Sequence, residues 1–299
     1  LTKRKNGTLR NIKKICIEVF ALINIEKPIA FVLVSTNHGM MIVNKHDYRD
    51  YKNDDGKNVR NGIGHQLLET SSYEAGEIDF AIGLLIARRR YYGDGMVVID
   101  CGANIGVLSI EWARFMTGWG KVISFEAQAK LFYALAGNIV LNNCLNIDAF
   151  HAAVGNKVGT MEIPEPDYLV PSSYGALDLE ERVNNMNIGQ KIDYTKVINV
   201  DLKTIDSLAL DRVDFIKIDV EGMEESVVEG SEGTIGKLKP ILFVEVLKSN
   251  TDAIHKKLSS LGYEIFPLGM NTLAVHKEDP TLKDISFNVG SSENTISIK

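Results

Sequence analysis

The stretch over residues 97–106 constrains the fold of this chain more than any other, and it reads VVIDCGANIG. An apolar, β-branched run leads to Asp100, Gly102 and Gly106 follow, and the residues over 107–110 have helical spacing. This order predicts a buried strand, a tight turn and the start of a helix. The glycines allow positive φ angles and a close approach of a ligand. Asp100 is then expected at the carboxyl end of its strand, where open α/β sheets bind their ligands.

The acids near this turn indicate the kind of ligand. Asp100 is a poor partner for phosphate, but a carboxylate accepts hydrogen bonds from hydroxyl and ammonium groups. Glu126 ends the next apolar run, KVISFE, 20 residues after Gly106. An acid there binds the hydroxyls of a ribose, and the alternative is an exposed acid that merely ends a strand. A dinucleotide-binding turn reads GxGxxG, whereas residue 104 is Asn and an acid precedes this turn. The pattern therefore favours a nucleoside with a cationic tail.

The composition bounds the class of protein. The 299 residues are 45% hydrophobic and 24% charged, which suffices for a large α/β domain with additions. The net charge of −6 and the lack of a basic, aromatic-rich run disfavour nucleic acid as a partner. Charged residues and Pro28 interrupt the longest apolar run, over 15–34, so no transmembrane segment is expected. Three cysteines without CxxC spacing favour a reducing compartment, and we expect a cytoplasmic protein.

After the first strand, the pattern alternates between strands and helices, which is typical of a parallel sheet. Further strands are expected over 121–126, 147–153, 213–219 and 240–246, and helices over 129–142, 223–238 and 251–261. Two more strands, over 263–267 and 271–276, form a predicted hairpin. The sheet is therefore expected to end with one antiparallel strand.

Residues 1–70 are predicted to form an N-terminal extension, with a helix over 11–25 and a hairpin over 30–43. Ser71 is followed three residues later by Glu74, which matches a capping box and predicts a helix from there to about residue 90.

The main domain is expected over 71–279. A polar insertion interrupts it over 164–199, and long loops in compact domains are usually functional or disordered. A polar, peripheral tail follows over 280–299.

A second group of acids lies in the segment IKIDVEG, over 216–222. Strand alternation places Lys217 and Asp219 on one face, and Asp219 falls beside the Asp100 turn if the two strands are neighbours. Glu221 follows directly, and Glu245 lies inside the apolar run FVEV. Burying a carboxylate is costly without a partner. One interpretation is a structural ion pair with Lys217; the other is an acidic cluster that faces a substrate.

These segments resemble the FkbM-type S-adenosylmethionine-dependent methyltransferases. The resemblance covers about residues 70–277 and rests on VVIDCGANIGVLSI, ISFEA, VDFIKIDVEGMEESVVEGSEGTI, PILFVEV and LGYEIF. It implies a Rossmann-like class I methyltransferase: an α/β fold with a mostly parallel seven-stranded sheet, an antiparallel last strand and helices on both faces. It also implies S-adenosylmethionine as cofactor and methylation of a hydroxyl group on a sugar, glycan or small metabolite. Residues 1–70, most of 164–199 and the tail match nothing in the family and would set the substrate.

The resemblance also implies roles for individual residues. The cofactor would contact Asp100, Gly102, Ala103, Asn104 and Gly106 at its methionine end, Glu126 at its ribose, and Ala127, Ala153 and Val154 at its adenine. Asp219 would face the methionine amine or the acceptor. The candidate catalytic residues are Asp219, Glu221 and Glu245, and His151 is a further candidate base for which a structural role is the stronger interpretation.

Several alternatives stay open. Asp219 and Glu245 could bind a divalent cation, but the flanking ligand pattern is absent, and we expect no metal site. An RNA or protein methyltransferase, or a non-catalytic protein that retains the fold, are alternative functions. The expected partner is a small-molecule or glycan acceptor, and nothing in the sequence excludes a homo-oligomer.

Overall fold

The computed structural model describes residues 28–53, 55–288 and 294–299. The chain divides into two units, over 1–30 and 31–299, and the fold described below is that of the second. The helix predicted over 11–25 lies outside the described residues. Within the described ranges, no helix combines the length and the apolar character needed to cross a membrane.

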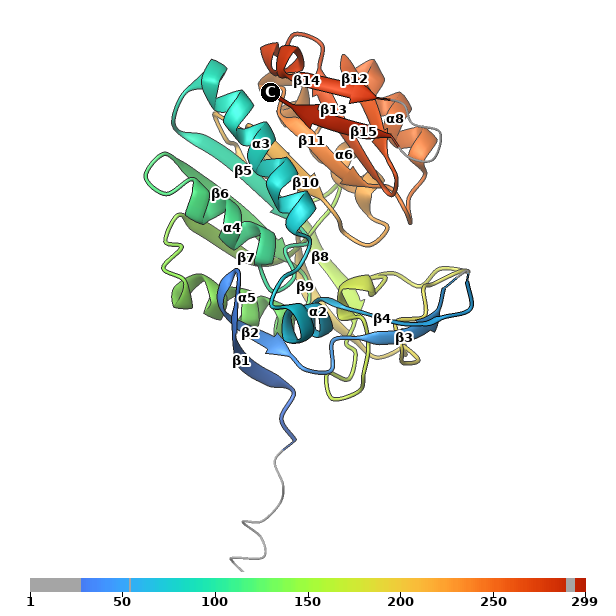
Figure 1. The fold of residues 1–299 in the computed structure, drawn as a ribbon. Coiled ribbons are helices and arrows are strands. Elements are labelled where there is room, and N and C mark those ends of the chain that lie inside the picture. Colours follow the sequence, from blue (N-terminus) through green and yellow to red (C-terminus); the bar gives the residue numbers. More distant parts are fainter. Residues whose placement is uncertain (1–27, 54, 289–293) are drawn as a thin grey trace, which may run out of the picture. The chain divides into compact units, whose positions relative to one another are not determined.

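A nine-stranded sheet forms the centre of residues 31–299, in the order β12-β13-β11-β10-β5-β6-β7-β9-β8 (Figure 1). Its strands are β5 (Met96–Cys101), β6 (Gly120–Glu126), β7 (Ile147–Val154), β8 (Gly159–Pro164), β9 (Val197–Lys203), β10 (Phe215–Ile218), β11 (Ile241–Glu245), β12 (Tyr263–Leu268) and β13 (Asn271–His276). All neighbouring pairs are parallel except those made by β13 and β8. The predicted α/β sheet with a reversed last strand, β13, is confirmed.

Two strands were not predicted. β8 and β9 extend the sheet beyond β7, so the sheet has nine strands where seven were expected. β8 lies at the edge, and its buried Ile163 and half-buried Met161 alternate with exposed Thr160 and Glu162. This two-residue period was available in the sequence. The insertion expected over 164–199 therefore lies between β8 and β9, and these two paired strands frame it.

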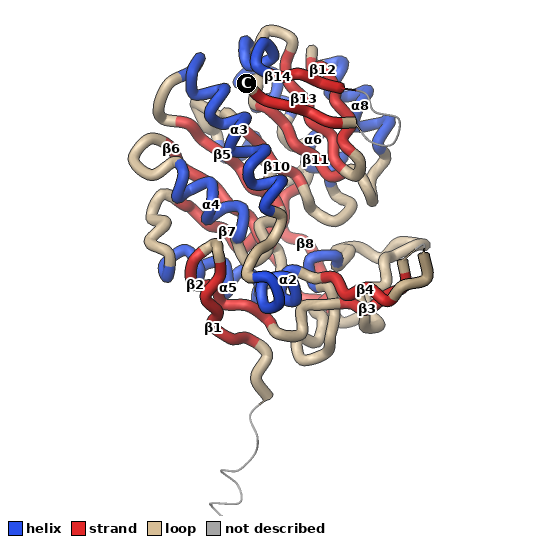
Figure 2. The backbone as a smooth tube through the Cα atoms, viewed as in Figure 1, coloured by secondary structure: helices blue, strands red, loops and turns tan. Residues whose placement is uncertain are grey.

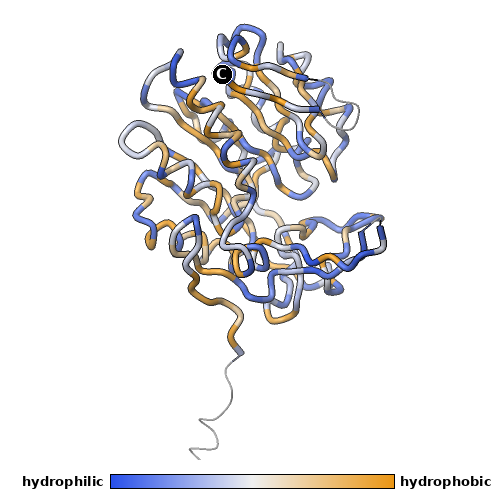
Figure 3. The backbone as a smooth tube through the Cα atoms, in the orientation of Figure 1, coloured by the Kyte–Doolittle hydropathy of each residue, from blue (hydrophilic) through white to orange (hydrophobic). Residues whose placement is uncertain are grey.

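Helices cover both faces of the sheet (Figure 2). Helices α3 (Ala75–Tyr92), α4 (Val107–Phe115) and α5 (Ala129–Leu141) pack on one face, and α6 (Glu224–Glu229), α7 (Glu232–Leu238) and α8 (Thr251–Ser260) pack on the other. The strands themselves are hydrophobic (Figure 3), and alternate residues enter the two layers. Phe215 packs against Trp112 of α4, whereas Ile216 and Ile218 join the opposite layer.

One predicted helix is split in two. The segment over 223–238 forms α6 and α7, which are separated at Gly230 and Ser231. A Cβ atom at Gly230 would lie 2.0 Å from the backbone oxygen of Gly155. The helix pair thus bends where its backbone touches the end of the neighbouring strand β7, a contact that helical periodicity does not reveal.

The N-terminal hairpin is confirmed as β1 (Phe31–Thr36) and β2 (Gly39–Asn44). The free edge of β2 is paired by two asparagines that lie one turn apart, Asn138 of α5 and Asn142 directly after it. Asn142 accepts from Met40 N at 3.1 Å and donates to Met40 O at 2.9 Å. Asn138 accepts from Ile42 N at 2.5 Å and donates to Ile42 O at 3.3 Å. Side-chain amides therefore replace a strand partner and hold the hairpin on the sheet's helical layer.

The predicted capping box at Ser71 and Glu74 is wrong. The hairpin is followed by β3 (Arg49–Lys52), β4 (Asn58–Asn61) and a short helix, α2 (Ile63–Thr70), which was not predicted. Ser71 ends α2 in a left-handed conformation with φ 58°, and its N–H donates to Leu67 O at 3.1 Å. Because Ser71 closes the preceding helix, it does not cap α3, which begins at residue 75 without a side-chain cap.

The tail over 280–299 is not peripheral as expected. It forms η3 (Pro280–Asp284), β14 (Ile285–Asn288) and β15 (Thr295–Ile298), and Ile285, Ile296 and Ile298 pack on the layer that contains α3. Arg88 of α3 secures this contact: its side chain is 3% exposed and pairs with Asp214 at 3.2 Å and with Asp279 before η3. Alternating isoleucines are the sequence signal for these strands.

We expect Arg88→Met to lower the free energy of unfolding by about 3–5 kcal/mol, because it leaves buried Asp279 without its cation, while Asp214 keeps Arg212 at 2.8 Å. Arg89→Met is the matched control, since Arg89 pairs with Asp94 at the surface, where the two side chains are 40% and 65% exposed. Arg89→Met should lower the free energy of unfolding by about 0–1 kcal/mol. Urea unfolding of both variants measures the difference, and equal losses would contradict the buried network.

Candidate functional site

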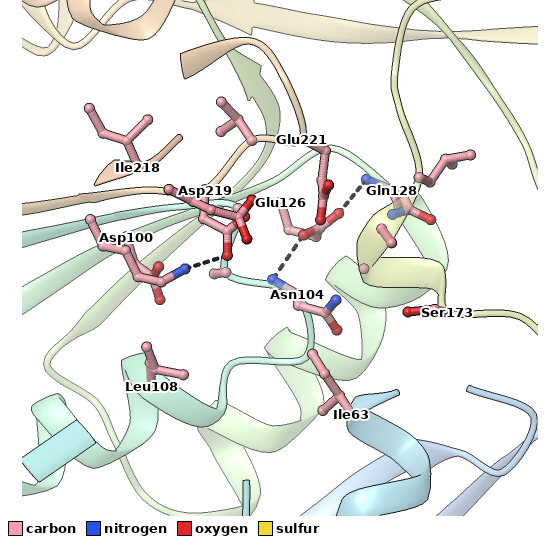
Figure 4. A pocket seen from close by; sticks show the side chains of 18 of the residues that line it. Ile63, Asp100, Asn104, Leu108, Glu126, Gln128, Ser173, Ile218, Asp219 and Glu221 are labelled. Atoms are coloured by element: carbon pink, nitrogen blue, oxygen red, sulfur yellow. Dashed lines mark hydrogen bonds and ion pairs between the residues drawn. The ribbon is translucent and has the colours of Figure 1, made fainter. Parts of the chain in front are cut away.

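A cavity of about 470 Å³ lies at the carboxyl ends of the central strands. Acids from neighbouring loops converge on it (Figure 4). The predicted residues that line it are Asp100, Gly102, Ala103, Asn104, Glu126, Ala127, Ala153, Val154, Asp219, Glu221 and Glu245. Gly106 is not among the lining residues; it precedes α4 with φ 88° and closes the turn. His151 is also not in the lining; its ring stacks on Phe132 and its Nε2 lies 3.1 Å from Ala127 O.

The glycine turn fits tightly against the loop that follows β10. Gly102 has φ 85°, and a Cβ atom there would lie 1.8 Å from the backbone oxygen of Asp219. β10 pairs with β5 so that Lys217 lies opposite Asp100, which confirms that the two strands are neighbours. Only glycine allows the two backbone segments to come this close, and their contact brings Asp100 and Asp219 to one edge of the sheet.

Asp100 has an unused hydrogen-bond acceptor inside the protein. Its side chain is 1% exposed, and Oδ2 accepts from Ser109 Oγ at 2.5 Å. Oδ1 is buried and has no hydrogen-bond partner among the described residues. Burial raises the pKa of Asp100, and nearby Lys217 opposes this rise. A buried acceptor without a partner costs about 1–3 kcal/mol, so the site is suited to a ligand that donates here.

Glu126 is a buried carboxylate that holds two loops together. Its Oε2 accepts from Asn104 N at 2.8 Å, and its Oε1 accepts from Gln128 N at 2.7 Å (Figure 4). The side chain is 6% exposed, so the alternative of an exposed strand end is wrong. Burial raises the pKa of Glu126 to about 7, and the two backbone hydrogen bonds limit the rise. Each carboxylate oxygen keeps a second lone pair for a hydroxyl donor.

Three further acids form a cluster, which we call the acid trio: Asp219, Glu221 and Glu245, whose carboxylate oxygens lie within 4.8 Å of one another. Lys217 Nζ donates to Asp219 Oδ2 at 2.9 Å, and Lys248 Nζ lies 2.5 Å from Glu221 Oε2. Among the described residues, no hydrogen bond or ion pair reaches the Glu245 side chain. The predicted structural pair between Lys217 and Glu245 is therefore wrong, because Lys217 is taken by Asp219.

Two members of the trio have raised pKa values. Burial, followed by the charge of Asp219, raises the pKa of both Glu221 and Glu245 to about 8. The spacing of the three carboxylates would suit a divalent cation, but ammonium groups already neutralise two of them. A further cation would lie beside Lys217 and Lys248, and this repulsion disfavours a metal at the trio.

A strained loop carries the middle member of the trio. Glu221 has φ 55°, which is uncommon for a residue other than glycine. Glu224 holds this loop: its Oε1 accepts from Val220 N and Gly222 N, both at 3.0 Å, and its Oε2 accepts from Ser249. Sequence reasoning missed Glu224, although an acid in the first turn of a helix commonly accepts free backbone N–H groups.

The insertion and the N-terminal segment form the remaining walls. The insertion lines the cavity with Ser173, Gly175, Ala176, Leu177, Leu179 and Met186, and the segment before α2 adds Arg49, Tyr51, Asn61 and Gly62. Asp47 joins the two: Oδ1 accepts from Tyr174 N at 3.1 Å, and Oδ2 accepts from Gly64 N at 3.0 Å. Sequence reasoning missed Asp47 and Lys248, because each contacts the insertion at residues that lie 70 or more positions away along the chain.

Sequence comparisons relate this chain to known methyltransferases. The family model described as the methyltransferase FkbM domain matches residues 100–265. Methyltransferase sdnD of Sordaria araneosa is 26% identical over 155 residues, which is 44% of this chain and 59% of that protein. Methyltransferase 1 of Beauveria bassiana is 24% identical over 188 residues, which is 58% of this chain and 74% of that protein. The match to the first of these proteins thus spans less than two thirds of its length.

Among solved structures, the methyltransferase FkbM from Methylobacillus flagellatus is similar, with a TM-score of 0.43 and 19% identity. The alignment covers 64% of this chain and 48% of that one. The matched family domain includes the glycine turn, Glu126 and the whole acid trio, and it spans more than half of the 299 residues. The chain therefore belongs to the FkbM methyltransferase family.

Proposed function

We propose that this chain is an S-adenosylmethionine-dependent methyltransferase that acts on a hydroxyl group of a sugar, glycan or small metabolite. The observation that carries this proposal is one cavity with two chemically distinct parts. Buried carboxylates with free acceptor capacity, Asp100 and Glu126, line one part, and the acid trio lines the other.

The residues of the first part suit the cofactor. Asp100 Oδ1 needs a donor such as an ammonium group, and Glu126 can accept from ribose hydroxyls beside its two backbone bonds. Ala127, Ala153 and Val154 offer an apolar lining for an aromatic base. When bound, S-adenosylmethionine supplies a methyl group on a sulfonium, which needs no further activation. The protein then has to orient the acceptor and exclude water.

Glu245 is the member of the trio best suited to take the proton of the acceptor hydroxyl. Asp219 and Glu221 are each bound by a lysine, whereas Glu245 has no partner among the described residues. Its pKa of about 8 is close to the neutral range in which a base is effective, and such a base contributes about 10²–10⁴ in rate. Both lysines near the trio are occupied by carboxylates, which disfavours a nucleic-acid acceptor and supports an uncharged one.

The wild-type protein should bind S-adenosylmethionine and not NAD, because the turn places an acid and no free N–H cradle where a pyrophosphate would lie. Calorimetric titration with both ligands is the measurement. Tighter binding of NAD would refute the proposed cofactor.

Binding of S-adenosylhomocysteine should weaken about tenfold from pH 8 to pH 6, given the pKa of about 7 for Glu126. The sign follows from protonation: below this pKa the carboxyl is neutral and loses acceptor strength toward hydroxyl donors. Glu126→Gln should abolish this pH dependence and weaken binding at pH 8 by about tenfold or more. Glu162→Gln, on the exposed side of β8, is the control and should bind like the wild type. A folded Glu126→Gln variant with unchanged affinity would show that Glu126 only joins the loops.

Glu245→Gln should lower turnover by about 10²-fold or more while S-adenosylhomocysteine still binds as in the wild type. Acceptors are first found by screening glycosides and hydroxylated metabolites for release of S-adenosylhomocysteine. Glu264→Gln removes an exposed charge from β12 and serves as the control. If Glu245→Gln turns over at the wild-type rate, the proton goes to another group.

A further inference from the structure

Lys248, which follows β11, contacts three oxygen atoms inside the protein. Its ammonium forms ion pairs with Glu221 Oε2 at 2.5 Å and with Asp178 Oδ1 at 3.2 Å, and it donates a hydrogen bond to Ala176 O at 2.8 Å. The side chain is 9% exposed. Lys248 is therefore a largely buried cross-link.

This cross-link joins the insertion to the acid trio. Asp178 and Ala176 belong to the insertion, whereas Glu221 belongs to the loop after β10. A second side chain of the insertion repeats the connection, since Arg182 donates to Gly222 O and, at 3.2 Å, to Lys248 O. Asp178 is itself fixed, because its Oδ2 accepts from Met186 N at 2.8 Å.

The cross-link supplies a positive charge to a crowded group of acids. Glu221 faces Asp219 from the end of β10, Glu245 from β11, Lys248 from the following loop, and Asp178 and Arg182 from the insertion. Lys217 pairs with Asp219, and Lys248 pairs with Glu221, so Glu245 is the member of the trio that has no ion-pair partner among the described residues. Without Lys248, two neighbouring carboxylates would be unpaired, and like charges at this distance share one proton.

We propose that Lys248 is a positioning residue that holds Glu221 against Asp219 and keeps Glu245 as the carboxylate open to the acceptor, with the insertion as the second anchor of the ammonium. This inference rests on the proposed function for the role of Glu245. It predicts that the charge beside Glu221 depends on the placement of the insertion.

The test follows the ionisation of Glu221 in cofactor-free protein by carbon-13 NMR of labelled glutamate carboxyls, with Glu221→Gln to assign the signal. Lys248→Met should raise the apparent pKa of Glu221 by about 1–3 pH units, because an opposite charge in contact is removed. Lys256→Met removes the same charge from the exposed face of α8 and should leave this titration unchanged. An unshifted titration in folded Lys248→Met overturns the proposal, because the ammonium would then not act on Glu221.

Asp178→Asn gives an independent test if Lys248→Met does not fold. It removes the second anchor of the ammonium, so Lys248 is held less well beside Glu221 and the pKa of Glu221 should rise above the wild-type value. Amides of residues 174–186 should exchange hydrogen faster. A wild-type pKa of Glu221 in this variant would overturn the proposal. Failure of the wild type to bind S-adenosylmethionine would instead refute the proposed function, because neither measurement here uses the cofactor.

Discussion

The whole site depends on the close contact between the ends of β5 and β10. Gly102 lies so near the backbone oxygen of Asp219 that a Cβ atom there would be 1.8 Å away. Parallel pairing of the two strands sets Lys217 opposite Asp100, and the contact at Gly102 then brings their following loops together. The cavity exists because two backbone segments meet where no side chain intervenes. A bulkier turn would separate the Asp100 part of the cavity from the acid trio.

This convergence concentrates negative charge in a partly buried space, and the protein compensates it in different ways. Glu126 is stabilised by backbone N–H groups, and Asp219 and Glu221 each have a lysine. Asp100 Oδ1 and Glu245 keep unused acceptors among the described residues. Buried carboxylates that lack partners lower the stability of the ligand-free protein. Such groups are frequent at functional sites. The pattern of compensation therefore separates groups that build the site from groups that are free to act.

The parts outside the seven expected strands complete the cavity. β8 and β9 frame the insertion, and Asp47 binds the insertion to the segment before α2. Lys248 then ties it to the trio. The insertion is also held by apolar packing, since Tyr168 and Tyr174 join one layer of the core and Leu179 joins the other. Buried hydrogen bonds then fix its position against the sheet, whose strands are themselves largely hydrophobic (Figure 3).

The sequence by itself determined the seven-stranded core, the reversed strand, the glycine turn and the acids at the strand ends. Those features follow from local periods and spacing, because strand alternation and helical spacing act over a few residues. Only the tertiary structure decided which lysine binds which carboxylate, since Lys217 prefers Asp219 and Lys248 comes from a different loop. It also decided the use of Ser71 as the end of α2 and the docking of the tail on Arg88. Ion pairs, close backbone contacts and docking of segments depend on distances between residues far apart in the chain, which a linear pattern does not contain.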